Sequence, residues 1–195
     1  MGTTRPRLEI IMGFDVHGKQ PKISGEKPEI DWNTNPSDAE RDKYFEDQDK
    51  YHQDNPGVYF RNNVWYWRPL WHYICLEVAP TILSDEDKER GEYNDYHLIN
   101  AIKAIYIANK IEELDAAGEL EAFAVKYQKG LDILPKEKCP HCNGTGVRND
   151  EHVRGKCNAC EEGLQESWVK SYPFDTDNVR EFARFARASG GFEIG

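Results

Sequence analysis

The second half of the chain carries the clearest periodic pattern of apolar residues. Apolar side chains recur at helical spacing over residues 98–114, and Gly118 follows where a helix commonly ends. A second pattern covers 120–127 and ends near Gly130, and a third covers 178–188. The inward face of this last helix is Val179, Phe182, Phe185 and Ala186. These patterns predict three helices, each with one apolar face.

The first half of the chain is more polar. Gly13–Gly18 alternates around Phe14 and Val16 and is typical of a short strand. Residues 19–55 follow as an acidic, polar insertion, in which 26–54 contains ten acidic and four basic residues. The second half of this insertion predicts a solvent-exposed helix, because few apolar groups are present to bury it.

Residues 57–74 are the most aromatic part of the chain. The pattern predicts extended backbone at Val58–Phe60 and at Val64–Trp67, and a helix that begins at Pro69 and ends near Pro80. Both faces of the second extended segment would be apolar, and such strands are normally covered on both sides. We therefore expect most of this stretch to belong to the core.

Five side chains in these regions could bind a ligand. Asp15 and His17 would share one side of their strand, and either metal binding or acid–base chemistry would suit them. Arg61 and Arg68 accompany Trp67, and an arginine stacked on tryptophan still presents its guanidinium group to a carboxylate or phosphate. The competing interpretation is that they form internal polar pairs.

Four cysteines form two CxxC pairs, Cys139 with Cys142 and Cys157 with Cys160, with fourteen residues between the pairs. Two such turns supply four sulfurs in a tetrahedron, which suits one Zn²⁺ at about 2.3 Å per bond. Four thiolates leave no open position for water, so this zinc would be structural. Gly144 provides the backbone freedom that the first turn needs. We expect a zinc-binding hairpin over residues 138–163.

The remaining cysteine and the nearby histidines are not expected to bind this metal. Cys75 falls on the apolar face of the predicted helix after Pro69 and is interpreted as a buried thiol. His141 and His152 lie near the cysteines but are better suited to positions outside the coordination shell.

Charge and composition restrict the function further. The chain of 195 residues carries 35 acidic and 25 basic residues, a net charge of −10. Such a charge disfavours duplex nucleic acid, although basic residues surround the cysteines. No apolar run approaches the length of a membrane span, and no secretory signal is visible. Paired cysteines of this kind suit a reducing cytosol.

Two resemblances add to this interpretation. The segment "CPHCNGTG" resembles one unit of the DnaJ-type zinc-finger family, whose units read CxxCxGxG, whereas in "CNACEEG" the glycine comes one position early. That resemblance implies zinc ligation only, because the chain has two units and no His-Pro-Asp motif. The segments "MGFDVHGK", "YFRNNVWYWRPLW", "SYPF" and "GGFEI" resemble a group of small uncharacterised bacteriophage proteins. This resemblance implies a viral origin and action inside a bacterial cytoplasm.

These observations predict an α+β protein, mostly helical, with a small sheet and a zinc hairpin. Residues 1–11 would be an extension and 12–195 a single domain. The expected function is that of a phage-encoded, non-enzymatic zinc protein that binds a host protein and inhibits or redirects it, in anti-defence or host takeover. The alternative is a small-molecule or nucleotide binder, or an enzyme, built on the five side chains above. A third hypothesis is nucleic-acid binding through the basic zinc segment.

Overall fold

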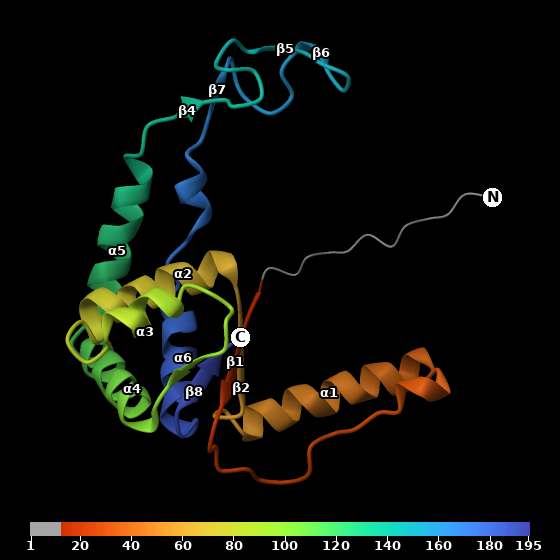
Figure 1. Ribbon diagram of the computed structural model, residues 1–195, viewed down its shortest axis with the longest axis vertical. Helices are drawn as coiled ribbons and strands as arrows, with labels where there is room; N and C mark the ends of the chain where they lie inside the picture. The colour runs from red at the N-terminus through yellow and green to blue at the C-terminus, as the bar shows by residue number, and fades with distance from the viewer. Residues whose placement is uncertain (1–12) are drawn as a thin grey trace. The chain divides into compact units, whose positions relative to one another are not determined.

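The computed structural model describes residues 13–195, so the predicted extension at 1–11 lies outside the described residues. The chain forms two compact units (Figure 1), one from residues up to 120 together with 175–195, and one from 121–174. The prediction of a mostly helical α+β fold is confirmed. The predicted zinc hairpin, 138–163, lies within the second unit, which also includes most of the helix that precedes it.

The elements follow one another in this order. In the first unit they are β1 (Gly13–Gly18), η1 (Trp32–Thr34), α1 (Asp38–Asp54), β2 (Tyr59–Asn63), α2 (Val64–Tyr73), a π-helical turn η2 (Ile74–Val78), α3 (Asp85–Arg90), β3 (His97–Ile99), α4 (Ala101–Ala116), α6 (Thr176–Ala188) and β8 (Phe192–Ile194). Helix α5 (Glu119–Asp132) leads into the second unit, which then holds β4 (Glu137–Lys138), β5 (Val147–Asn149), β6 (Arg154–Lys156), β7 (Leu164–Gln165) and η3 (Trp168–Ser171).

A four-stranded antiparallel sheet in the order β2-β1-β8-β3 forms the base of the first unit. Helices α2 and α6 contact one face of this sheet, and α4 packs against α6. Alternation along β1 directs Phe14 and Val16 into this layer and leaves Asp15 and His17 on the opposite face. The strand predicted at Gly13–Gly18 and the inward face predicted for α6 are both confirmed.

Stacked aromatic rings form the centre of the core. Trp67 is fully buried, and its ring stacks on Phe14 at 5.0 Å and on Trp71 at 5.6 Å between centroids. Phe182 of α6 meets Trp67 edge-on at 5.8 Å. The indole N–H groups of Trp67 and Trp71 donate to the carbonyls of Gly91 and Lys88, so these buried donors are satisfied. The prediction that the aromatic stretch is mostly core is confirmed.

The strand predicted at Val64–Trp67 is wrong, because helix α2 begins at Val64. The side-chain oxygen of Asn63 accepts hydrogen bonds from the N–H groups of Trp65 and Tyr66 and caps the helix. Pro69 lies inside the helix rather than at its start. The cap and the burial of Trp67, Leu70 and Trp71 on one helical face outweigh the β propensity of the local residues.

Helix α4 also departs from the predicted boundaries. It begins at Ala101 after the cap residue Asn100, whereas Leu98 lies in β3. Its buried face consists of Ala104, Ile107, Ala108, Ile111 and Leu114. Ile102 and Ile105 are exposed, although the periodic pattern predicts that they are buried. The surface of α4 therefore carries two overlapping stripes of apolar residues. The stripe that packs against α6 is the buried one.

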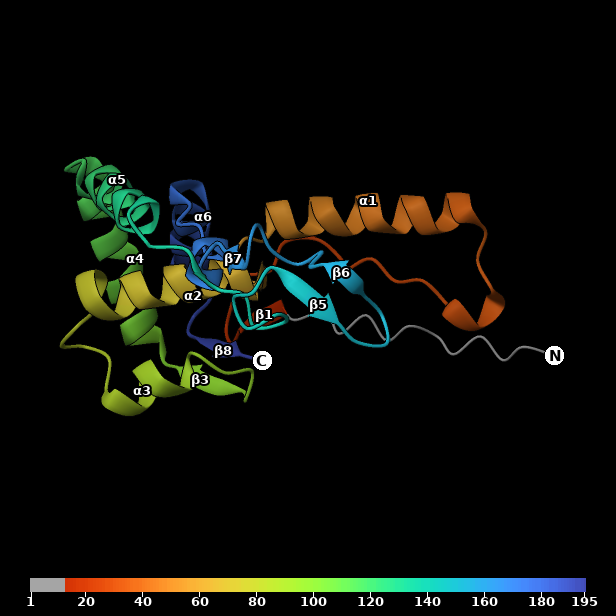
Figure 2. The same cartoon turned by 90° about the horizontal axis from the view of Figure 1, so that it is seen from above.

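Residues 19–55, which we call the arm, form the predicted acidic insertion. The loop after β1 runs outward to η1, and helix α1 runs back alongside this loop toward β2 (Figures 1 and 2). Ser37 and Glu40 form a capping box at the start of α1, and Tyr51 is the buried residue of this helix. Asn55 ties the base of the loop to the helix through hydrogen bonds with Ser24. The prediction of a solvent-exposed helix is confirmed.

In the second unit, short strand pairs replace a large sheet. β4 pairs with β7 and β5 pairs with β6, both antiparallel. Phe123 and Tyr127 of α5 cluster with Phe174, and the Tyr127 hydroxyl donates to the carbonyl of Tyr172. Throughout residues 13–195, no helix combines the length and apolar character that a membrane span requires.

Candidate metal centre

The two CxxC segments hold each other through reciprocal backbone hydrogen bonds. The N–H of Cys139 donates to the carbonyl of Gly163, and the N–H of Cys157 donates to the carbonyl of Gly146, each at 2.8 Å. The first cysteine of each CxxC pair is therefore hydrogen-bonded to a glycine that follows the turn of the other pair. These two hydrogen bonds join both turns in one small hairpin assembly, independently of any bond to a metal.

Two pairs of left-handed residues close the turns. Asn143 and Gly144 have φ values of 52° and 82°, and Glu162 and Gly163 have values of 51° and 89°. Glu161 and Leu164 exchange two backbone hydrogen bonds of 2.9 Å across the second pair, as in a two-residue hairpin turn whose central residues both have positive φ. Gly163 is the second left-handed residue of its turn, as Gly144 is of the first. The glycine therefore follows its CxxC pair by three residues in the second unit and by two in the first, which explains why the second unit departs from the CxxCxGxG pattern.

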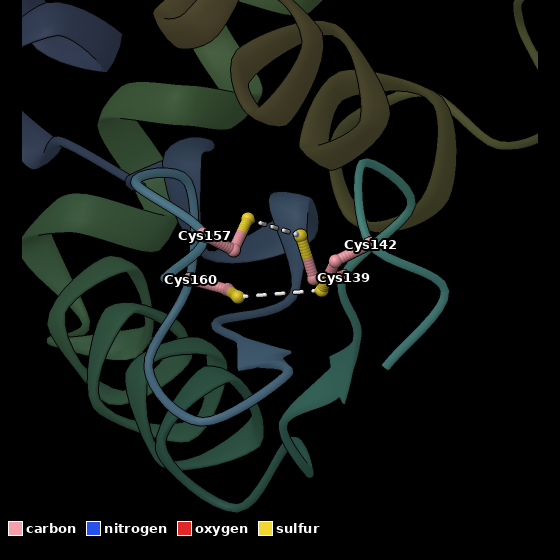
Figure 3. Close-up of side chains that lie close together, drawn as sticks. All are labelled: Cys139, Cys142, Cys157 and Cys160. Atoms are coloured by element: carbon pink, nitrogen blue, oxygen red, sulfur yellow. Dashed lines mark hydrogen bonds between the residues drawn. The ribbon is translucent and has the colours of Figure 1, made fainter. Parts of the chain in front are cut away.

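The four cysteine sulfurs converge (Figure 3), and all four lie within 4.8 Å of one another. The Sγ atoms of Cys139 and Cys157 are 4.0 Å apart, and those of Cys142 and Cys160 are 3.6 Å apart. A tetrahedron of sulfurs about 2.3 Å from a zinc ion has edges of about 3.8 Å, which lies between these two distances. The residues therefore fit one four-coordinate metal ion, as the spacing predicts.

The backbone favours the thiolate form that a metal requires. Loss of solvation raises the pKa of the Cys142 thiol, but the N–H groups of Gly146 and Gly144 and the neighbouring thiols outweigh it and hold this pKa at about 6. The Gly146 N–H lies 3.3 Å from Cys142 Sγ. For Cys160, lost solvation and the adjacent thiols raise the pKa. Neighbouring thiolates repel one another, and a divalent cation would offset that repulsion. Metal binding and thiol ionisation are therefore coupled.

The other cysteine and the nearby histidines do not join the cluster. Cys75 is buried on η2, and burial raises the pKa of its thiol to about 12, which keeps it protonated. His141 is exposed, and His152 is exposed and lies 3.1 Å from the carboxylate of Glu151. The prediction that these three residues are not ligands is consistent with their positions.

The proposed ligand residues do not form one pocket. Trp67 is enclosed in the aromatic core, on the opposite face of β1 from Asp15 and His17. Arg68 is on the exposed side of α2, near Glu92. Burial raises the pKa of the Glu92 carboxyl, although the charge of Arg68 acts in the opposite direction. The prediction that Arg68 and Trp67 share a site with Asp15 is not supported by this geometry, because the sheet lies between their faces.

Three of the five do gather on the open face of the sheet. Asp15 pairs across the strands with Arg61, whose Nε is 3.9 Å from the carboxylate, and it accepts a hydrogen bond from the Tyr59 hydroxyl. The rings of His17 and His52 lie on either side of Tyr59, each 5.2 Å from it. Burial, and then the hydrogen bond to Asp15, raise the pKa of Tyr59 well above its ordinary value.

Tyr59 and His52 were missed as members of this polar cluster. The alternation of β2 could have indicated Tyr59, because Tyr59 and Arg61 fall on the same side of that strand. His52 comes from the arm, more than 30 residues from β1 in sequence, so local pattern gives no signal for it. Asp15 is paired with the Tyr59 hydroxyl and with Arg61, which favours the internal polar pairing considered above for these residues.

Comparisons of the chain with known protein families, with curated proteins and with solved structures gave no match. The four-cysteine arrangement of the metal centre is compatible with one zinc ion.

Proposed function

We propose that this protein is a phage-encoded zinc protein that acts by binding a host protein in the bacterial cytoplasm, and that it inhibits or redirects that partner without catalysing a reaction. The observation that carries the proposal is the closed coordination shell. Four thiolates leave a metal ion no position for water or substrate, so the metal organises the chain rather than performing chemistry.

The surface around this centre supports a binding role. The second unit buries few apolar side chains apart from its cysteines and Leu131. Several apolar side chains are instead exposed, among them Ile133, Val147, Leu164 and Trp168, the last with 59% of its surface open to solvent. Exposed tryptophan and aliphatic side chains on a small rigid scaffold are typical of protein-binding surfaces.

Charge favours a protein partner over nucleic acid. Residues 121–174 contain eight acidic and eight basic residues, so the unit with the metal centre has no net charge before metal binding. The whole −10 therefore falls on the remainder of the chain. Binding to a phosphate backbone is favoured by an excess of cations, and neither part of the chain has a net positive charge.

The test is capture of a partner from bacterial lysate by the zinc-loaded full chain, followed by identification of the captured protein and reconstitution of the complex from purified components. We expect one host protein to bind at a fixed stoichiometry, and Trp168→Ala to weaken the reconstituted complex. Tyr93→Ala removes a similarly exposed aromatic ring from the first unit and serves as the control. Failure to capture any host protein reproducibly would contradict the proposal.

A further inference from the structure

The arm contains a large groove that the metal centre does not explain. The groove lies between the loop at 24–36 and helix α1 and has a volume of about 1130 Å³. This is slightly more than the volume of typical small-ligand pockets, so a short stretch of polypeptide fits. Its walls come from segments of one arm, and most of their residues are exposed.

An exposed aromatic cluster accompanies the groove. The ring of Trp32 in η1 lies 5.7 Å from Tyr44 and 6.3 Å from Phe45 of α1, and the last two lie 5.5 Å from each other. Of these three residues only Tyr44 also lines the groove, so the cluster adjoins the groove at this residue. Trp32 and Phe45 each keep 52% of their surface exposed, so the contacts that hold the loop to the helix cover only half of either residue.

This cluster is unusual for its surroundings. Helix α1 is polar on all sides and buries only Tyr51 in its length, so the aromatic residues contribute to no core. Solvent-exposed aromatic groups that gather on an otherwise polar surface mark contact sites, because covering them with a partner removes apolar area from water. The cluster, rather than the charge of the arm, therefore identifies this surface as a binding site.

The charges around the groove determine the chemistry of the occupant. Six carboxylates and three lysines line it. Several are already engaged, since Glu40 caps α1 through Ser37 and Asp47 pairs with Lys43. Glu26, Glu29 and Asp54 have no ion-pair partner among the described residues, and the same holds for Lys27 and Lys50. With six carboxylates against three lysines, the lining carries a net charge of −3. A cationic occupant is favoured, and an anionic one is repelled.

We propose that the groove of the arm binds an arginine-rich, extended segment of a partner protein. Some guanidinium groups of this segment stack on the cluster of Trp32, Tyr44 and Phe45, and others donate hydrogen bonds to groove carboxylates such as those of Glu26 and Glu29. Arginine suits both contacts better than lysine, because its planar group stacks on aromatic rings and binds carboxylates in a bidentate manner. This inference rests on the proposed function, since it assigns a surface and a chemistry to the host-protein contact.

The experiment measures fluorescence anisotropy of a short labelled peptide of alternating arginine and serine, with lysine/serine and glycine/serine peptides for comparison. The zinc-loaded full chain is used at an ionic strength of about 0.15 M, where exposed charges are partly screened. We expect the arginine peptide to bind more tightly than the lysine peptide, and the neutral peptide not to bind. Lack of arginine-peptide binding by the parent protein would overturn the proposal.

Two variant pairs separate stacking from charge. Trp32→Ala with Phe45→Ala should weaken the arginine peptide about three- to fivefold and abolish its advantage over lysine. Glu26→Gln with Glu29→Gln should weaken both cationic peptides without affecting the fold, because both side chains are exposed. Asp85→Asn with Glu89→Gln removes the same charge from exposed positions of α3 and should leave both affinities unchanged.

The outcomes distinguish this inference from the proposed function. The groove proposal is overturned if the α3 variant pair weakens peptide binding as much as the Glu26→Gln with Glu29→Gln pair does. It is also overturned if the Trp32→Ala with Phe45→Ala pair keeps the parent's preference for arginine over lysine. If the host protein captured by the parent binds the arm variants equally well, the groove proposal fails while the proposed function stands. If the parent captures no host protein but the arginine peptide binds as expected, the proposed function fails on its own.

Discussion

At the scale of single residues, the metal centre depends on the close approach of two glycines. A Cβ atom added to Gly163 would lie 2.1 Å from the carbonyl oxygen of Gly144, much closer than any real contact of this kind. The same residue has a φ of 89°, a region that other residues avoid. The peptide of Gly163 also accepts the hydrogen bond from Cys139, so displacing it would move the first ligand turn.

We therefore expect Gly163→Ala to weaken zinc binding strongly. The added methyl group must push the two turns apart, which separates the two pairs of sulfurs. Zinc affinity can be measured by competition with a chromophoric chelator, and folding of the unit by its thermal transition. Gly155→Ala is the matched control, because Gly155 also has a positive φ of 118° but has no atom within 4 Å of the added Cβ. Equal loss of affinity in both variants would show that backbone strain, rather than the close approach, limits binding.

At the scale of elements, a buried carboxylate joins three parts of the first unit. Asp87 of α3 caps its own helix through Ser84, lies 3.0 Å from His97 Nε2 of β3, and pairs with the ammonium group of Lys103 of α4. Only 4% of Asp87 is exposed. Burial alone would raise the pKa of this carboxyl, but the hydrogen bonds from Lys103, Ser84 and His97 together hold it well below its usual range.

This network predicts a specific dependence of stability on pH. Because the folded-state pKa of Asp87 is depressed, its contribution is fully present above the unfolded-state pKa of about 4 and is lost as the pH falls below that value. Asp87→Asn should cost about 3 to 5 kcal/mol near neutral pH, since it leaves the charge of Lys103 without its partner. Urea unfolding of parent and variant at a series of pH values should show the difference shrinking in acid.

A matched variant on the same helix provides the control for this prediction. Asp85→Asn alters an exposed carboxylate of α3 and should change neither the stability nor its pH dependence appreciably. A difference between parent and Asp87→Asn that stays constant from pH 7 to pH 3 would mean that the pKa of Asp87 is not depressed in the folded protein relative to the unfolded chain.

At the scale of the whole molecule, the two units are stabilised by different means. The first unit buries a continuous set of large side chains around Trp67, Trp71 and Phe182. In the second unit three of the four metal-binding cysteines form the buried cluster, and the fourth, Cys160, packs against it. Binding free energy of a structural zinc is largely folding free energy for the segment that holds it, about 10 to 16 kcal/mol in small zinc peptides. Loss of the metal and loss of the aromatic core should therefore affect different residues.

We expect Cys139→Ser, or removal of zinc by a chelator, to increase amide hydrogen exchange over 138–163 while the core of the first unit stays protected. Trp67→Ala should instead cost the first unit about 3 to 5 kcal/mol, because it removes a large, fully buried side chain. Hydrogen exchange followed by mass spectrometry measures both effects in one experiment. Global unfolding of the cysteine variant, with parent-like stability of Trp67→Ala, would reverse the assigned roles.

The sequence alone determined the features that depend on local spacing and composition. The two CxxC pairs predict the metal ligands because ligand chemistry needs only four thiols at the right separations. The polar composition of the arm predicts its exposure because such a segment cannot bury apolar surface. The inward face of α6 and the alternation of β1 follow from the geometry of one helix and one strand.

Only the tertiary structure decided which of two locally plausible states is adopted. Val64–Trp67 has the residues of a strand, yet it is helical because Asn63 caps it and a single face is buried against β1 and α6. Trp65 and Trp67 are both tryptophans, but one is 41% exposed and the other is at the centre of the core. The groove of the arm and the cluster around Tyr59 join residues distant in sequence. Burial and proximity of this kind depend on the summed free energy of non-local contacts, which periodicity within one segment does not encode.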